Sequence, residues 1–322
     1  MIVDQNEKTL EPKNQLTLYG YDKYFYSFKN LYKKNNLPNV ILLSGPKGSG
    51  KSTFIYHFIN YLLSTNDKNK YDPENFTINS NNNSFKLVNN LIHPNFYLLD
   101  RALSDDSIKI DQIRSLLKFL SKTVYSRGIK IVLIDNSEYL NLNSSNALLK
   151  ALEEPSNNTY FFIINNNQSK IISTIKSRCV YFKIHFTLSE KKNIFNKLAL
   201  ENQLNFDDVN LDKFLYFNAP GDFLKNLIIL KDLNLNISKD YLSSILFLMN
   251  HYKNVKDINL LNFITLCIEN FYNELSLKDS QNINNYFVNK YKILYLINDL
   301  KKFNLDKKNL VFSINKILKN ET

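Results

Sequence analysis

Half of the glycines in this chain lie in one short loop, Gly45-Pro46-Lys47-Gly48-Ser49-Gly50-Lys51-Ser52-Thr53. The 322 residues contain 6 Gly, and three of them fall here. Glycine permits positive φ and close approach of a ligand to the main chain, as a loop wrapped around phosphate requires. The spacing fits G-x-x-x-x-G-K-[ST], with Lys51 as the cation for the β- and γ-phosphates and Ser52 as a magnesium ligand. We therefore expect residues 45–53 to bind a nucleotide.

The segments on either side of this loop have the patterns that a P-loop requires. Val40-Ile41-Leu42-Leu43 is a short apolar run, typical of a parallel strand covered on both faces. After Ser52, apolar residues recur at helical spacing, namely Phe54, Ile55, Phe58, Ile59 and Leu62. The N-terminus of this helix would direct its dipole and free N–H groups at the phosphates. A chance glycine turn would not explain why a strand pattern precedes the loop and a helical pattern follows it.

The formal net charge of +11 has two interpretations. It would suit an acidic partner such as nucleic acid, or it follows from a coding bias toward Lys, Asn and Ile. The two cysteines, Cys179 and Cys267, are far apart and form no C-x-x-C pair, so we expect neither a disulfide framework nor a zinc site. With no apolar leader or membrane-length run, the sequence predicts a soluble, cytoplasmic protein.

Two further strand ends carry polar side chains suited to a nucleotide site. The apolar run 129–134 ends in Asp135, and ligands of open α/β sheets bind at the carboxyl ends of strands, where Asp135 could orient the waters of Mg²⁺. The run 160–164 leads to Asn165-Asn166-Asn167, where an amide could sense a γ-phosphate or an attacking water. Asparagine also commonly begins a turn, so Asn165 alone leaves both interpretations open.

The periodicity changes along the chain. Residues 1–17 read as an extended arm and 64–90 as a polar surface loop. Strands are expected at 96–99 and 180–182, and helices at 21–32, 108–120 and 143–155, the last capped by Ser144 or Ser145. This alternation predicts a parallel sheet flanked by helices. From residue 188 onward helical spacing dominates, with breaks at 218–221 and 234–238. We expect a nucleotide-binding domain at 1–185, a small helical domain at 186–235 and a larger helical domain at 236–322.

The order of these motifs resembles that of the bacterial clamp-loader AAA+ ATPases of DNA polymerase III. The sequence Asn146-Ala-Leu-Leu-Lys-Ala-Leu-Glu-Glu-Pro155, followed by Ser177-Arg178-Cys179, is highly specific to clamp loaders. The resemblance is strong over about residues 18–185 and weak beyond. It implies an AAA+ module with a helical lid, followed by an all-α collar through which subunits form a hetero-oligomeric ring.

The resemblance also implies roles for single residues. Arg178 would be an arginine finger that reaches the γ-phosphate bound by a neighbouring subunit, since a guanidinium is always charged and can neutralise phosphoryl charge. The alternative is an ordinary surface arginine. Where an active ATPase of the family carries Asp-Glu, this chain has Asp135-Asn136, and Asp222 and Lys225 stand near the position of a sensor arginine. We therefore expect binding of ATP and Mg²⁺ without much hydrolysis.

These expectations combine into a clamp-loader subunit that helps a ring open a sliding clamp and place it on primed DNA. Its expected partners are the gamma/tau and delta subunits, together with the clamp and the DNA through the complex, and no membrane. A gamma/tau-type motor ATPase is the alternative, which Asn136 disfavours. A small-molecule P-loop kinase is a weaker one, because the residues indicate no acceptor pocket.

Overall fold

The computed structural model describes residues 10–101, 107–123, 128–166, 172–204, 211–231, 241–255, 258–279, 281–303 and 307–320. The described residues up to 197 form one compact unit, and those from 198 onward form a second. The boundary falls inside α8 (Leu188–Glu201), so the expected three-domain division at 185 and 235 stays a prediction.

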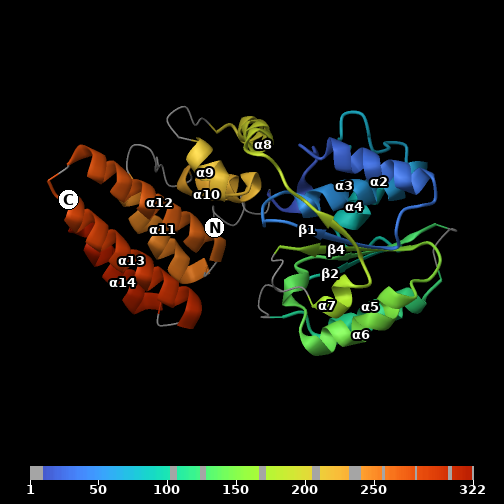
Figure 1. Cartoon of the computed structure of the whole chain (residues 1–322). Helices are drawn as coiled ribbons and strands as arrows, with labels where there is room; N and C mark the ends of the chain where they lie inside the picture. Colours follow the sequence, from blue (N-terminus) through green and yellow to red (C-terminus); the bar gives the residue numbers. More distant parts are fainter. Residues whose placement is uncertain are drawn as a thin grey trace. The chain divides into compact units, whose positions relative to one another are not determined.

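A parallel sheet with the strand order β2-β3-β4-β1-β5 forms the centre of the first unit (Figure 1). Its strands are β1 (Val40–Ser44), β2 (Phe96–Leu99), β3 (Lys130–Ile134), β4 (Thr159–Asn165) and β5 (Val180–Lys183). β1 and β3 are buried at every residue, as their continuous apolar runs predict. Ser44 at the end of β1 lies opposite Asn165 at the end of β4. The carboxyl ends of the central strands therefore meet at one edge.

Helices cover both faces of the sheet (Figure 1). The first face carries α2 (Asp22–Lys33), α3 (Lys51–Leu63) and α4 (Asn83–Asn89), and the second carries α5 (Ile110–Ser121), α6 (Leu142–Glu153) and α7 (Ser173–Lys176). Aromatic rings fill the first interface, where Phe58 meets Phe162 at 5.9 Å and Phe28 meets Phe182 at 5.0 Å between ring centroids. Buried aliphatic side chains dominate the second, among them Ile113, Leu116 and Leu148. Short 3-10 helices occupy Pro12–Asn14 (η1), Ser64–Asn66 (η2) and Ser137–Tyr139 (η4).

Two local expectations are wrong. The polar segment 64–90 is not one surface loop, because α4 lies within it. Asn82 is buried and caps this helix by accepting a 2.6 Å hydrogen bond from the Phe85 amide, a role that asparagine performs well. The N-cap of α6 is Asn141, which accepts from the Ser144 amide at 2.8 Å, and the Ser144 hydroxyl instead donates to the Ile108 carbonyl.

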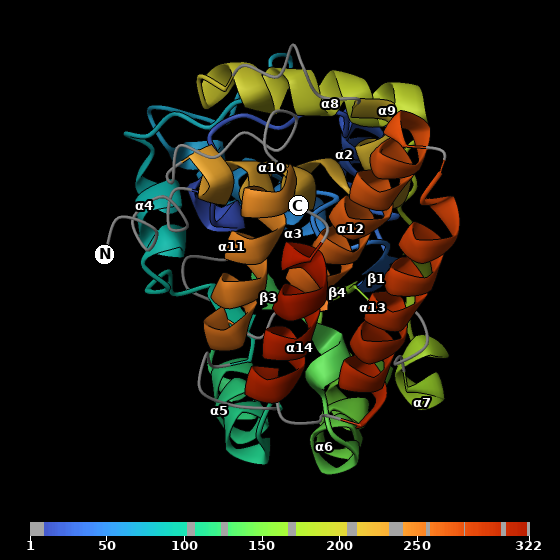
Figure 2. The ribbon, with the colours of Figure 1, turned by 90° about the vertical axis from the view of Figure 1, so that its left-hand side faces the viewer.

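The second unit is entirely helical where the structure describes it. It contains the last turn of α8 and the helices α9 (Leu211–Phe217), α10 (Pro220–Lys231), α11 (Tyr241–Val255), α12 (Ile258–Lys278), α13 (Ile283–Phe303) and α14 (Lys307–Lys319). Figure 2 shows α11 to α14 as neighbouring helices, and α11 packs against both α12 and α14. The break expected at 218–221 separates α9 from α10, whereas 234–238 lies outside the described residues.

Aromatic packing joins the helices of this second unit. Phe214 of α9 stacks on Phe223 of α10 at 5.2 Å, and both rings contact Phe263 of α12 at 5.9 Å. All three side chains are buried. No helix among the described residues is long and apolar enough to cross a membrane.

Candidate functional site

The glycine-rich loop connects β1 to α3, which confirms the strand, loop and helix order expected of a P-loop. Gly48 and Gly50 have φ of 76° and 88°, in the left-handed region that favours glycine. A Cβ at Gly45 would lie 2.7 Å from the Ile184 carbonyl oxygen. The backbone therefore favours glycine at positions 48 and 50 through its positive φ, and at position 45 through the lack of space for a side chain. Pro46 and Lys47 are exposed on the loop, whereas Ser49 is buried.

The Lys51 ammonium lies across the loop. Its Nζ donates to the carbonyl oxygens of Gly45 at 2.9 Å and Pro46 at 2.7 Å. The residue is only 3% exposed, and this burial lowers the pKa of Lys51 to about 8. An anionic phosphate oxygen would be a stronger acceptor than these neutral carbonyls, because its negative charge attracts the ammonium in addition to the hydrogen bond.

Ser52 and Asp135 come together from the start of α3 and the end of β3. The Ser52 hydroxyl donates to Asp135 Oδ2 at 2.7 Å. Burial and the neighbouring Asp100 carboxylate raise the pKa of Asp135 to about 6, so a nearby cation would stabilise its charged form. Hydroxyl and carboxylate oxygens are ligands that suit Mg²⁺, directly or through water. These residues fit a magnesium ion that is held mainly by nucleotide phosphates. Thr53 follows them, half-buried in the first turn of α3.

Asn165 borders the P-loop at the end of β4. Its carbonyl accepts a 3.3 Å hydrogen bond from the Gly45 amide, and its side-chain Nδ2 donates to the Ser137 hydroxyl at 3.4 Å. The residue is fully buried, and its Oδ1 has no hydrogen-bond partner in the structure. A buried acceptor left unpaired costs roughly 1–3 kcal/mol. A donor from a bound ligand or its water would satisfy this oxygen.

The Asn166 side chain connects Asn136 and Glu138, and the sequence did not predict this contact. Its Nδ2 donates to Asn136 Oδ1 at 2.9 Å and to Glu138 Oε1 at 3.0 Å, and its backbone N–H donates to Glu138 Oε2 at 3.1 Å. Asn136 in turn donates to Asp100 Oδ1 at 2.9 Å. Asp100 follows β2 as Asp135 follows β3, and that signal could have marked it. Asn167 lies outside the described residues.

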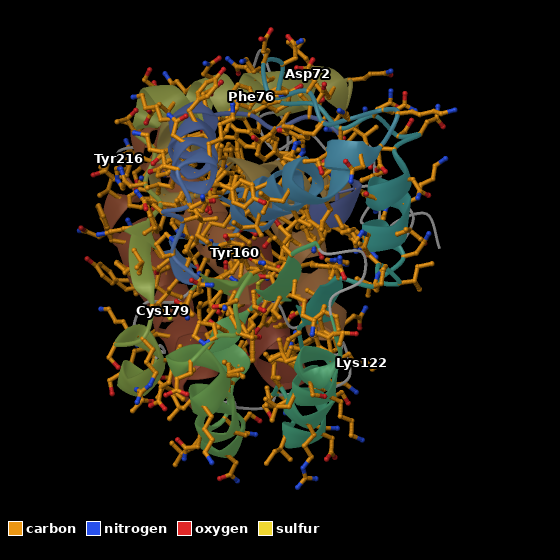
Figure 3. The ribbon with its side chains drawn as sticks, turned by 90° about the vertical axis from the view of Figure 1, so that its right-hand side faces the viewer. Asp72, Phe76, Lys122, Tyr160, Cys179 and Tyr216 are labelled. Atoms are coloured by element: carbon orange, nitrogen blue, oxygen red, sulfur yellow. The ribbon has the colours of Figure 1, made fainter. Side chains whose placement is uncertain are left out.

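Arg178 lies at the edge of the sheet opposite its own P-loop. It precedes β5, which runs parallel to β1 with Val180 opposite Ile41. At the rise of a parallel strand, Gly45 is about 13 Å farther along the strand direction than Val180, and Arg178 lies in the turn before Val180, so the P-loop is beyond the reach of its side chain. Figure 3 labels the adjacent Cys179 beside the short helix α7.

The Arg178 guanidinium is held by groups of its own chain. Its Nε donates to Glu153 Oε1 at 2.8 Å, its Nη2 contacts the same oxygen, and its Nη1 donates to the Thr174 carbonyl at 2.8 Å. The side chain stays 29% exposed. The partly exposed Arg178 side chain thus lies near the N-terminal edge of the sheet, paired with Glu153 and apart from the P-loop. Asp222 and Lys225 lie on α10, in the second unit.

The comparisons with known proteins agree with this geometry. The family described as DNA polymerase III, delta subunit, matches residues 20–187. DNA polymerase III subunit delta' of Pseudomonas aeruginosa is 35% identical over 142 residues, which cover 44% of this chain and 42% of that protein. The chain therefore aligns with less than half the length of this relative. Subunit delta' of Buchnera aphidicola from Schizaphis graminum is 26% identical over 288 residues, covering 85% and 84%.

Among solved structures, a gamma subunit-related protein from Thermotoga maritima covers 92% of this chain and 99% of its own, with a TM-score of 0.48 and 16% identity. At that score the likeness supports no conclusion by itself. The fold class expected from the sequence is nevertheless confirmed by the parallel sheet, the P-loop and the helical second unit. Because the family match spans more than half of the residues, this chain belongs to the DNA polymerase III, delta subunit, family within the clamp-loader AAA+ proteins.

Proposed function

We propose that this chain is a delta'-type subunit of the DNA polymerase III clamp loader that binds ATP with Mg²⁺ and supplies Arg178 to a neighbouring subunit. The position of Arg178 carries the proposal. The residue lies in the turn before Val180, and the P-loop of its own chain begins about 13 Å beyond Val180 along the strand direction, so Arg178 would complete a site on another molecule. The relatives named delta' support the assignment to this subunit type.

Nucleotide binding would use groups already placed at one edge of the sheet. The backbone N–H groups of residues 45–50 would surround the phosphates, with the Lys51 ammonium bound to their oxygens. Ser52 and Asp135 would hold Mg²⁺, which neutralises phosphate charge when bound. The Asn165 amide would contact the terminal phosphate or its water. These roles keep the site residues of the sequence analysis as proposals.

Hydrolysis in this chain would be slow because no free carboxylate is aimed at the site from the position after Asp135. Asn136 occupies that position, and its amide is committed to Asp100 and Asn166. Glu138 is the nearest alternative, but both of its oxygens accept hydrogen bonds from Asn166. A bound triphosphate would therefore persist, and turnover would occur where Arg178 meets a partner that has its own catalytic base.

The proposal includes the partners expected from the sequence. These are gamma/tau and delta subunits in a ring, with the sliding clamp and primed DNA acting through the complex. The ring would load the clamp at the expense of ATP during replication. A cytoplasmic location and the lid and collar roles of residues 186–235 and 236–322 follow from the same proposal.

Nucleotide titration of the isolated chain tests the first half of the proposal. A fluorescent ATP analogue with Mg²⁺ should bind the wild type, and Lys51→Ala should abolish binding because it removes the buried ammonium. Steady-state turnover by the wild type should be negligible. Robust turnover would overturn the assignment and favour the gamma/tau-type motor instead.

A reconstituted complex tests the second half. In a ring assembled with gamma/tau and delta subunits, Arg178→Ala should slow hydrolysis at the site it completes by roughly a thousandfold. Nucleotide affinity of the isolated variant should stay unchanged. Arg114→Ala is a matched control, because Arg114 is an exposed arginine whose ion pair is with nearby Asp111 on the same helix. Unaltered hydrolysis by the Arg178→Ala ring would refute the role in trans.

A further inference from the structure

Tyr21 lies against the P-loop, although neither its sequence position nor the proposed function gives it a role. Its hydroxyl donates a 3.0 Å hydrogen bond to the backbone carbonyl of Ser49. Its ring also lies against Gly50, where an added Cβ would come 3.3 Å from the Tyr21 Cε2 atom. The residue is 1% exposed. Tyr21 thus contacts the two residues that immediately precede Lys51.

The hydrogen bond fixes the direction of one peptide group in the loop. In a planar trans peptide the C=O and the following N–H point in opposite directions. Because the Ser49 carbonyl points at Tyr21, the Gly50 N–H points away from Tyr21. In a P-loop the backbone N–H groups surround the phosphates. The Tyr21 hydroxyl therefore selects the peptide orientation that leaves the Gly50 N–H available to a phosphate oxygen.

The ring of Tyr21 is held firmly enough to serve this purpose. It stacks on Phe54 of α3, with centroids 4.8 Å apart and planes at 11°, and it meets Phe186 edge-on at 5.3 Å. The preceding Gly20 has φ of 76°, and a Cβ there would come 2.4 Å from Ile194 Cδ1. Phe54 and Phe186 thus hold the ring in place, and Ile194 packs against the residue that precedes it.

We infer that Tyr21 is a positioning residue for the phosphates of the nucleotide, because it orients the Ser49–Gly50 peptide from behind the loop. This inference rests on the proposed nucleotide binding and identifies a residue that controls it. Glycine at position 50 gives this peptide access to more orientations than another residue would, so a specific hydrogen bond is needed to select one of them. The hydroxyl restricts that freedom without touching the ligand.

Tyr21→Phe tests the inference, since it removes the hydroxyl and keeps the ring. Tyr24→Phe is the matched control, because Tyr24 belongs to the same cluster, 5.6 Å from Tyr21 and 6.5 Å from Phe54. Titration with a fluorescent ATP analogue and Mg²⁺ should show binding about three- to tenfold weaker for Tyr21→Phe, the value of one neutral hydrogen bond. Tyr24→Phe should change binding less than twofold. Both variants should keep the melting temperature of the wild type within a few degrees.

Selective labelling with ¹⁵N-glycine gives a readout that a purely structural role would leave unchanged. The chain has only 6 Gly, so the Gly50 amide resonance can be assigned by comparing the spectrum with that of Gly50→Ala. Nucleotide should shift this resonance strongly in the wild type and much less in Tyr21→Phe. If the wild type binds nucleotide while Tyr21→Phe shows the same affinity and the same Gly50 shift, the positioning role is refuted. If the wild type itself fails to bind, the proposed nucleotide binding falls, and the role of Tyr21 falls with it.

Discussion

Asp135→Asn should stabilise the folded protein at neutral pH while weakening its site. Burial and the Asp100 carboxylate raise the pKa of Asp135 from 3.8 to about 6. Between these two values the folded chain binds more protons than the unfolded chain, so the free energy of unfolding falls as the pH rises. Above pH 6 the folded chain carries the full cost of burying the Asp135 charge. The difference between the two pKa values corresponds to about 3 kcal/mol of unfolding free energy.

Part of this gain is lost through Lys51. The Asp135 carboxylate raises the pKa of this buried lysine, so removing the carboxylate makes the charged ammonium more costly to bury. Asparagine keeps an acceptor for the Ser52 hydroxyl and has nearly the same size as aspartate. We therefore expect Asp135→Asn to increase the free energy of unfolding by about 1–2 kcal/mol at pH 7.5 and by only a small fraction of that near pH 4.

Urea denaturation followed by circular dichroism between pH 4 and pH 8 measures this difference. Glu74→Gln is the control, because Glu74 is an exposed carboxylate whose removal should change stability by less than about 0.5 kcal/mol at any pH. Titration with an ATP analogue should show that Asp135→Asn loses most of the contribution of Mg²⁺ to binding. A variant that is destabilised at every pH, or a gain that does not depend on pH, would refute the reasoning.

Three further predictions concern other residues of the first unit. Gly45→Ala should destabilise the chain by about 1–3 kcal/mol and impair nucleotide binding, because the new Cβ would lie 2.7 Å from the Ile184 carbonyl oxygen; denaturation and titration measure both effects. Lys130→Met should cost about 1–2 kcal/mol, since the buried Lys130 ammonium donates to carbonyls at the end of α5 at 2.8 and 3.2 Å, whereas exposed Lys118→Met should be nearly neutral in the same assay. Burial lowers the pKa of His57 to about 3, so the folded chain leaves it neutral while the unfolded chain protonates it below pH 6.5. Protonation of His57 in the unfolded chain should therefore lower the free energy of unfolding by about 2 kcal/mol between pH 7.5 and pH 5. His57→Gln should remove this part of the pH dependence, as urea denaturation of both proteins at the two pH values would measure.

The parts of the fold that the sequence predicted are those that local patterns determine. Val40–Ser44 and Lys130–Ile134 form strands because an uninterrupted apolar run is stable only where both faces are covered. Gly48 and Gly50 in the loop before Lys51 have positive φ, and the spacing of the glycines in the sequence predicts this conformation. Expected and observed bounds of these elements differ by one or two residues.

The unpredicted parts depend on which segments meet in space. The Tyr21 hydroxyl reaches a carbonyl 28 residues away, and nothing in the sequence distinguishes this tyrosine from the other 19 tyrosines of the chain. Arg178 pairs with Glu153, which lies 25 residues earlier in the chain, before β4. The N-cap of α4 was missed because Asn82 lies among several asparagines, and only burial distinguishes the one that caps a helix. Such contacts form between segments that only the folded sheet brings together, so local sequence patterns do not predict them.

The energetics of the P-loop edge indicate why these residues are present together. Burial shifts Lys51 and Asp135 toward their neutral forms, lowering one pKa to about 8 and raising the other to about 6. Asn165 adds a buried oxygen without a partner. Each of these features disfavours the folded chain by itself, and apolar residues of similar size would avoid the cost. A triphosphate with its magnesium ion and bound water would offset all three penalties, because the phosphates bring anionic acceptors to Lys51, the ion brings positive charge to Asp135, and a water molecule can donate a hydrogen bond to Asn165. The combination is therefore the main energetic support for the proposal that this chain binds a nucleotide in addition to supplying Arg178.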